Sequence, residues 1–146
     1  MARLIVTQDV SAPQQHVWDV LTDWGVHDRW MLLTRASGDR AQGGRVEAFT
    51  GVGPVGFVDR MTITVWEPPR IAVVRHTGRV VRGSGSFEVK PLSANRSQVV
   101  WSEYIDPPLG VVGRLGWPLV RPLFQIFVQA SLRRLARYVE QRRSRT

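Results

Sequence analysis

The sequence contains no cysteine, and Lys90 is the only lysine among its 20 basic residues. The absence of cysteine excludes a disulfide scaffold, a thiolate metal site and a cysteine nucleophile. Acidic residues are also scarce: 12 Asp and Glu leave a formal net charge of +8 at pH 7. The charge balance therefore raises the question of an anionic partner.

Long hydrophobic runs are absent as well. The longest uncharged segments, Ala48–Val58 and Pro122–Leu132, have 11 residues each, whereas a membrane-spanning helix needs about 20. The first 9 residues become polar too early for the apolar core of a secretory signal peptide. With 146 residues, the chain is predicted to form one domain over residues 1–146 and to be cytoplasmic.

The basic residues are scattered, apart from a cluster near the C-terminus. Polyphosphate binding needs a concentrated basic patch, usually with aromatic side chains that stack on bases. Here the aromatic residues fall mostly in apolar patterns elsewhere in the chain. We interpret the cluster as a solvated helix face, and nucleic acid is not an expected partner. The cluster comprises Arg133, Arg134, Arg137, Arg142, Arg143 and Arg145.

The N-terminal third predicts one strand followed by two helices. Residues 3–10 alternate well enough for a strand. Ser11, Pro13 and Gln14 then have the pattern of a helix start, with Ser11 as the cap, a first-turn proline and a capping-box glutamine. Apolar residues at helical spacing continue this first helix, and residues 27–30 form a second short turn or helix; the apolar residues are Val17, Leu21 and Trp24.

From Thr34 onward the apolar period changes to two. Turns rich in Gly, Pro and Asn separate strand-like segments, and the short links predict antiparallel neighbours. A long terminal helix is predicted to begin at about Pro118 or Pro122, to end at Arg143 and to pack under the sheet. The strand-like segments are 45–50, 55–66, 70–77, 81–92 and 97–106.

This order of elements, together with a set of local motifs, resembles the SRPBCC superfamily of START-like and birch-pollen-allergen-like proteins, and within it the bacterial polyketide cyclase/dehydrase family. The resemblance implies an α+β helix-grip fold. In that fold a curved antiparallel sheet of about six or seven strands wraps a long C-terminal helix, and two short helices follow the first strand. It also implies an elongated apolar cavity between sheet and helix. The matching segments are Ser11–Pro13, Val17–Leu21, Asp23–Trp30, Trp66–Arg70, Val99–Glu103 and Leu132–Ala136.

Apolar and aromatic side chains aimed at that cavity are the candidate ligand-binding residues. A concave apolar space with a few polar anchors is typical of small-molecule sites, although each of these side chains could equally be packed core. The candidates are Phe57, Met61, Ile63, Phe87, Val89, Trp101, Phe124, Phe127 and Ser131.

Polar residues inside the strands are the candidate catalytic groups. If Phe57 and Met61 point inward, alternation places Asp59 inward with them. In the same way, an inward Trp101 places Glu103 inward, and an inward Val73 places Arg75 inward. A buried carboxylate must pair with a cation or become protonated, so a Glu103–Arg75 pair could orient a ligand. Tyr104 is a further candidate for proton transfer. The same alternation predicts a surface position for His76, and a bulge that turns the carboxylates outward is the alternative.

Two other motifs are interpreted without a cofactor. Residues 51–56 match G-x-G-x-x-G, but a strand follows them where a dinucleotide site needs a helix, so a hairpin turn is the better interpretation. His16, Asp19 and Asp23 could share a helix face with metal-ligand spacing, which a solvated face explains equally well. We therefore predict neither a metal nor a cofactor.

Three classes of function remain after these exclusions. The first is binding of a hydrophobic small molecule: a lipid, a polyketide or an aromatic compound. The second, raised by the family resemblance, is a polyketide aromatase/cyclase or dehydratase that uses polar cavity residues. The third is peripheral contact with an anionic membrane or a partner through the apolar segment 117–128 and the arginines that follow it. The sequence is compatible with a monomer or a homodimer.

Overall fold

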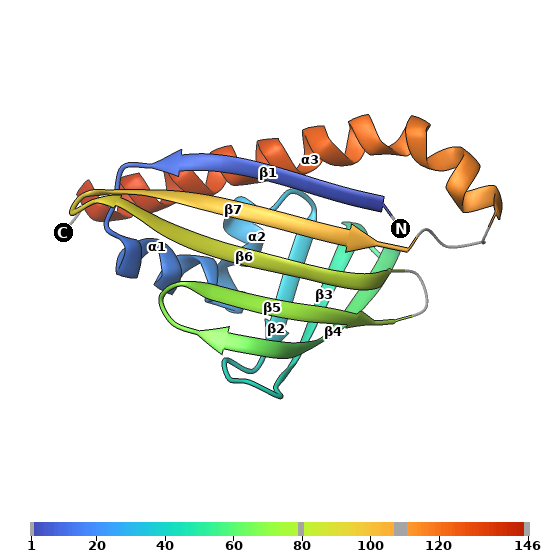
Figure 1. Ribbon diagram of the computed structural model, residues 1–146, viewed down its shortest axis with the longest axis horizontal. Coiled ribbons are helices and arrows are strands. Elements are labelled where there is room, and N and C mark those ends of the chain that lie inside the picture. Colours follow the sequence, from blue (N-terminus) through green and yellow to red (C-terminus); the bar gives the residue numbers. More distant parts are fainter. Residues whose placement is uncertain (1, 79–80, 107–110, 145–146) are drawn as a thin grey trace.

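One curled antiparallel sheet with a long helix along it forms the molecule (Figure 1). The computed structural model describes residues 2–78, 81–106 and 111–144. In chain order the elements are β1 (Ala2–Val10), α1 (Gln14–Leu21), η1 (Trp24–Val26), α2 (His27–Trp30), β2 (Thr34–Gly38), β3 (Arg45–Val52), β4 (Val55–Glu67), β5 (Ile71–Thr77), β6 (Arg82–Ser93), β7 (Arg96–Ile105) and α3 (Val111–Ser144). The predicted helix-grip fold is confirmed.

The seven strands have the order β1-β7-β6-β5-β4-β3-β2, and every neighbouring pair is antiparallel. Consecutive strands from β2 to β7 are neighbours, as their short links predict. Residues 51–56 form the hairpin between β3 and β4, in which Gly53 takes a positive φ of 59°. The G-x-G-x-x-G match is therefore a turn, and no helix follows it.

The main core lies between the β1 end of the sheet, α1, α2 and the second half of α3. Trp18 and Trp30 are its largest fully buried side chains. Val128, Leu132, Leu135 and Val139 of α3 are also fully buried in it. Burying a large apolar side chain stabilises a fold by about 1.5–3 kcal/mol, so this cluster holds the helix against the sheet.

The start of α1 differs from the prediction. Its N-cap is Pro13, which has no side-chain hydrogen bond to offer. The amide of Ser11 instead donates to Glu140 Oε2 of α3 at 2.9 Å, and the Gln14 side chain donates to the Val89 carbonyl of β6 at 2.9 Å. Pro13 thus occupies the N-cap position predicted for Ser11. The hydrogen bonds of Ser11 and Gln14 connect the start of α1 to α3 and to β6.

The start of α3 also differs from the prediction. The helix begins at Val111, so that Pro118 and Pro122 lie inside it. A proline removes one backbone donor and bends a helix without necessarily ending it, and the first turns of α3 curve in Figure 1. Packing under the sheet holds for the second half only: most large apolar side chains between Val111 and Ile126 are exposed. Arg145 of the predicted basic cluster lies outside the described residues.

Among the described residues, none of the helices combines the length and the apolar character needed to cross a membrane.

Candidate functional site

The concave side of the sheet encloses a cavity of about 430 Å³. Strands β3 to β7 supply most of its wall, and the short helices and α3 supply the rest. Its size lies in the range of small-molecule sites, about 300–1,000 Å³. Most of its lining is apolar: Trp24, Met31, Ala36, Val46, Ala48, Phe57, Met61, Ala72, Val74, Val81, Phe87, Trp101, Ile105, Phe124 and Phe127.

Aromatic rings form one wall of this pocket. Phe87 of β6 and Trp101 of β7 are partners in the sheet register, and their ring centroids are 5.0 Å apart in an edge-to-face arrangement. Trp30 of α2 packs against both rings from the core, at 6.3 and 6.4 Å. Such contacts fix ring orientation, so the wall has a defined shape before any ligand enters.

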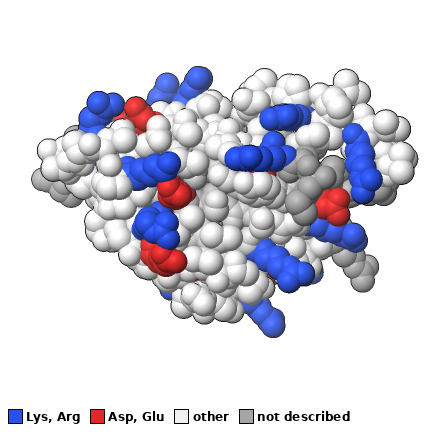
Figure 2. All heavy atoms as spheres, viewed as in Figure 1, with Lys and Arg blue, Asp and Glu red and all other residues white. Residues whose placement is uncertain are grey.

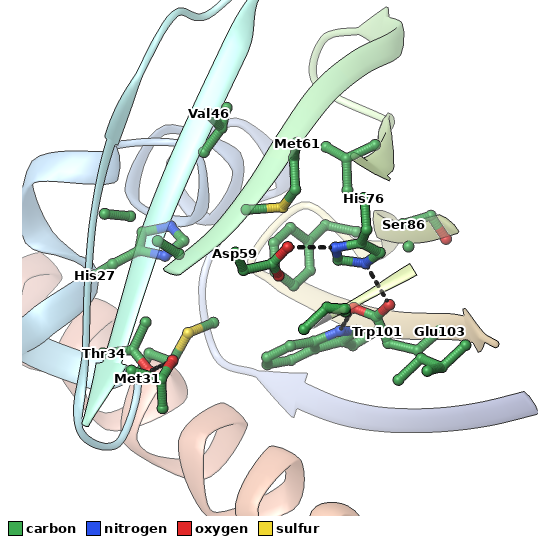
Figure 3. Close-up of a pocket in the computed structure, with 18 of the residues that line it drawn as sticks. His27, Met31, Thr34, Val46, Asp59, Met61, His76, Ser86, Trp101 and Glu103 are labelled. Carbon is green, nitrogen blue, oxygen red and sulfur yellow. Dashed lines mark hydrogen bonds and ion pairs between the residues drawn. The ribbon is translucent and has the colours of Figure 1, made fainter. Parts of the chain in front are cut away.

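A buried hydrogen-bond network lies at the polar part of the pocket (Figure 3). His76 Nδ1 is 2.9 Å from Asp59 Oδ1, and His76 Nε2 is 3.0 Å from Glu103 Oε2. The Trp101 indole N–H donates to the other Glu103 oxygen at 2.8 Å. The side chain of His76 is only 4% exposed, against 16% for Asp59 and 10% for Glu103.

The network determines the charge of His76. Burial alone would lower the pKa of this imidazole, but its hydrogen bonds to Asp59 and Glu103 and their negative charges outweigh burial and raise the pKa to about 10. His76 is therefore an imidazolium at neutral pH, and each ring N–H donates to one carboxylate. Both ring nitrogens are occupied, so a polar group of a ligand that reaches this network must bind to the carboxylates and not to the imidazolium.

A glycine makes room for this arrangement. Gly85 of β6 is the register partner of Glu103, and a Cβ placed on it would lie 2.7 Å from both Glu103 carboxylate oxygens. Any larger residue would push the carboxylate away from His76. Glycine, which has no side chain, therefore occupies the position on β6 that faces the Glu103 carboxylate.

A second histidine, His27 of α2, lines the opposite part of the pocket. Its Nε2 is 2.9 Å from the Leu21 carbonyl, and its ring lies between Trp24 and Trp30 at centroid distances of 5.1 and 4.7 Å. Burial lowers the pKa of His27 to about 4. This imidazole is neutral at pH 7, with Nε2–H donating to the carbonyl, and the two histidines of the pocket hold opposite protonation states.

Two threonine hydroxyls complete the polar lining beside His27. Thr34 Oγ1 of β2 and Thr50 Oγ1 of β3 are 2.9 Å apart, and Thr34 also donates to the Leu32 carbonyl at 2.9 Å. A hydroxyl has one donor and two acceptor positions. The pair therefore offers acceptor capacity toward the pocket.

The structure brings many of the predicted site residues together. Asp59 and Glu103 face the pocket, as alternation along β4 and β7 predicts, and so do six apolar candidates: Phe57, Met61, Phe87, Trp101, Phe124 and Phe127.

Three other candidates do not line the pocket. Ile63 and Val89 are fully buried in the core, and Ser131 accepts a hydrogen bond at 3.1 Å from the Leu32 amide. All three are fully covered by neighbouring side chains, which leaves no surface for a ligand.

The structure contradicts the prediction that Arg75 and Tyr104 face the pocket. Arg75 is exposed on the convex side of the sheet, and Glu103 pairs with His76 in its place. The inward residues of β5 are Ala72, Val74 and His76. Tyr104 is 39% exposed, with the guanidinium of Arg3 5.6 Å from its ring centroid. It follows the inward Glu103 in β7, so its side chain must point outward.

Sequence reasoning missed His76, because the pattern of β5 does not show which of its two faces points inward. The run Ile71–Val74 is apolar throughout, so it fits either phase of alternation. Two inward carboxylates on β4 and β7 need a cation on the strands between them, but one phase of β5 supplies Arg75 and the other supplies His76, so this need does not choose between them. Among the described residues, no group of three His, Cys, Asp or Glu side chains could hold a metal ion.

Residues 1–140 match the sequence model of the family described as polyketide cyclase/dehydrase and lipid transport. The chain belongs to this family. The match covers all elements that line the pocket, from η1 to α3. No significant match was found among curated protein sequences.

Solved structures similar to this family member share its fold at low sequence identity. The Zhui aromatase/cyclase from Streptomyces sp. R1128 superposes with a TM-score of 0.77 and 19% identity over 97% of this chain and 94% of that chain. A protein from Thermus thermophilus gives a TM-score of 0.76 and 15% identity over 96% and 98%. The di-domain aromatase/cyclase BexL of the BE-7585A biosynthetic pathway gives 0.75 and 16% over 96% and 47%. These similarities establish the fold.

Proposed function

We propose that this protein binds an apolar small molecule that carries a hydrogen-bond donor, such as a hydroxylated lipid, polyketide or aromatic compound. The observation that carries the proposal is an apolar cavity of about 430 Å³ with its charged groups gathered in one network. Apolar walls provide affinity, while a few fixed polar groups set orientation. The family and the aromatase/cyclase neighbours support this class of ligand.

Asp59 is the group best placed to anchor the ligand. Its Oδ1 is bonded to His76, and within the described part of the chain Oδ2 has no hydrogen-bond partner. Both Glu103 oxygens are already bonded, to His76 and to Trp101. A carboxylate oxygen accepts hydrogen bonds and offers no donor. Asp59 Oδ2 therefore selects a hydroxyl, phenol or ammonium group and disfavours a carbonyl or carboxylate.

Filling the pocket should weaken ligand binding. Ala48 of β3 lines the cavity, whereas its neighbour Glu47 points to the solvent on the other face. We expect Ala48→Phe to weaken binding of a polycyclic phenol at least about tenfold, because the added ring occupies ligand space. Binding is measured by quenching of tryptophan fluorescence, since Trp24 and Trp101 line the pocket.

Glu47→Phe is the matched control for this measurement. It adds the same ring to the same strand outside the cavity, and affinity should stay within about twofold of the parent chain. Equal affinities of the parent chain and Ala48→Phe would contradict binding in this pocket.

A second candidate function is proton-transfer catalysis, as an aromatase/cyclase or dehydratase. The specific observation in its favour is the Asp59–His76 pair inside a largely apolar pocket. A carboxylate can take a proton from the methylene between two carbonyls, and the same carboxyl group can return that proton to the departing hydroxide while the hydrogen bond from His76 holds it in place. Both steps are required for aldol cyclisation followed by loss of water.

Asp59→Asn tests this second function. If the protein is a catalyst, the variant should convert a linear poly-β-ketone thioester at least about 100-fold more slowly, since a positioned base contributes about 10²–10⁴. Products that have lost water are followed by mass spectrometry. A parent chain that binds the thioester but leaves it unchanged, with no difference from Asp59→Asn, would exclude catalysis and leave the binding function.

A further inference from the structure

The first half of α3 carries exposed apolar side chains along its outer face. Val111, Leu115, Leu119, Leu123 and Ile126 are each more than half exposed, and Leu119 reaches 79%. Soluble proteins rarely expose contiguous apolar patches of this kind without an interaction that covers them. In Figure 2 the matching part of the surface, at upper right, is mostly uncharged, with basic side chains at its margins.

These side chains form a stripe distinct from the pocket lining. Leu115, Leu119 and Leu123 are separated by four residues and Ile126 follows three later, which places them on one side of a helix. Phe124 and Phe127, which line the cavity, occupy other helical positions. The stripe therefore serves neither the core nor the pocket.

The charge of the helix points to an anionic partner. From Val111 to Val139 the helix contains no Asp or Glu, and Arg133 and Arg137 continue the apolar stripe, seven and eleven residues after Ile126. Both arginines are exposed, as are Arg114 and Arg121 in the apolar half. An exposed face with apolar and arginine side chains has the composition of helices that lie at a membrane surface.

We propose that this outer face of α3, from Val111 to Arg137, docks on an anionic lipid bilayer. The leucines enter the boundary between headgroups and acyl chains, and the arginines contact lipid phosphates. The helix lies on the bilayer, since it is not apolar enough to span it. A second copy of the chain fits this face less well, because two acid-free faces would bring arginines against arginines. Docking does not depend on which ligand the pocket holds.

The test is co-sedimentation with vesicles of phosphatidylcholine alone and of phosphatidylcholine and phosphatidylglycerol in equal parts. We expect binding to the anionic vesicles that falls with added salt, and little binding to the neutral ones. Leu119→Asp should weaken binding at least about tenfold, because it puts a charge at the centre of the stripe. Leu92→Asp is the matched control: Leu92 is also exposed, at the far end of β6, and the change in charge is the same.

Two outcomes would overturn the proposal: absence of the parent chain from the anionic vesicle pellet, or equal binding of the parent chain and Leu119→Asp. Sedimentation velocity of the same proteins gives a third, since a dimer that Leu119→Asp disrupts, without vesicle binding, would make the face a contact between copies. The pocket-filling Ala48→Phe variant should still bind vesicles, and Leu119→Asp should still bind the phenol. Failure of docking is therefore separable from failure of ligand binding.

Discussion

Replacing His76 with leucine is expected to lower the free energy of unfolding at pH 7 by about 3–5 kcal/mol, the usual effect of removing one partner from a buried ion pair. The loss arises because Asp59 and Glu103 remain in the pocket wall without the cation that now lies 2.9 and 3.0 Å from them. Neither carboxylate has another basic side chain within ion-pair distance in the described part of the chain. Urea denaturation at constant pH measures the change.

A compensating variant separates the charge effect from loss of packing. Adding Asp59→Asn and Glu103→Gln to His76→Leu removes both unpaired charges and keeps side chains of similar size. Stability should then recover by at least about half of the loss, as happens when a buried ionic group is replaced as a unit. If His76→Leu alone stays within about 1 kcal/mol of the parent chain, the network does not hold the site together.

The stability of the protein should pass through a maximum near pH 6.5. Burial lowers the pKa of His27 to about 4. Between pH 6.5 and 4, His27 therefore binds a proton in the unfolded chain but not in the folded chain. The carboxylates raise the pKa of His76 to about 10 against the opposing effect of burial, so between pH 6.5 and 10 the folded chain holds a proton that the unfolded chain has lost. Stability therefore falls on both sides, by up to about 1.4 kcal/mol per pH unit for each histidine.

A single variant assigns the acid limb of this profile. His27→Gln keeps an N–H for the Leu21 carbonyl but does not titrate, so it should flatten the acid limb and leave the alkaline limb unchanged. Urea midpoints between pH 4 and 10 measure both slopes. An acid limb that His27→Gln leaves intact would show that another group titrates there. NMR of the imidazole rings gives a direct check, since His27 should stay neutral, and His76 charged, at pH 7.

The part of the site that the sequence predicts rests on strong, unambiguous periodicity. In β4, Met61 and Ile63 alternate with an arginine and two threonines, so the inward phase, which includes Asp59, follows from the sequence. In β5 the apolar run Ile71–Val74 carries no phase, and the wrong choice exchanged His76 for Arg75. One slip in register reverses every side chain of a strand.

The start of α3 could not be predicted for a different reason. Two prolines and a series of glycines made the segment before Pro122 resemble a connection, yet the helix runs through both prolines. Its apolar residues were expected under the sheet because apolar side chains usually lie there. What decides their exposure is length: α3 has 34 residues, and its first turns project beyond the strands in Figure 1.

The two halves of α3 differ in how firmly they are held, and this difference bears on how a ligand reaches the pocket. From Val128 to Val139 the helix is anchored in the core, whereas before Ile126 it lacks the backbone donors of Pro118 and Pro122 and leaves its leucines uncovered. Local opening of such a segment costs far less free energy than global unfolding. Phe124 and Phe127 lie at the junction of the two halves. The part of the cavity wall that α3 forms can therefore move outward while the core residues from Val128 onward stay packed. We therefore expect ligand exchange to require the opening of only a few helical turns, with the rest of the domain still folded.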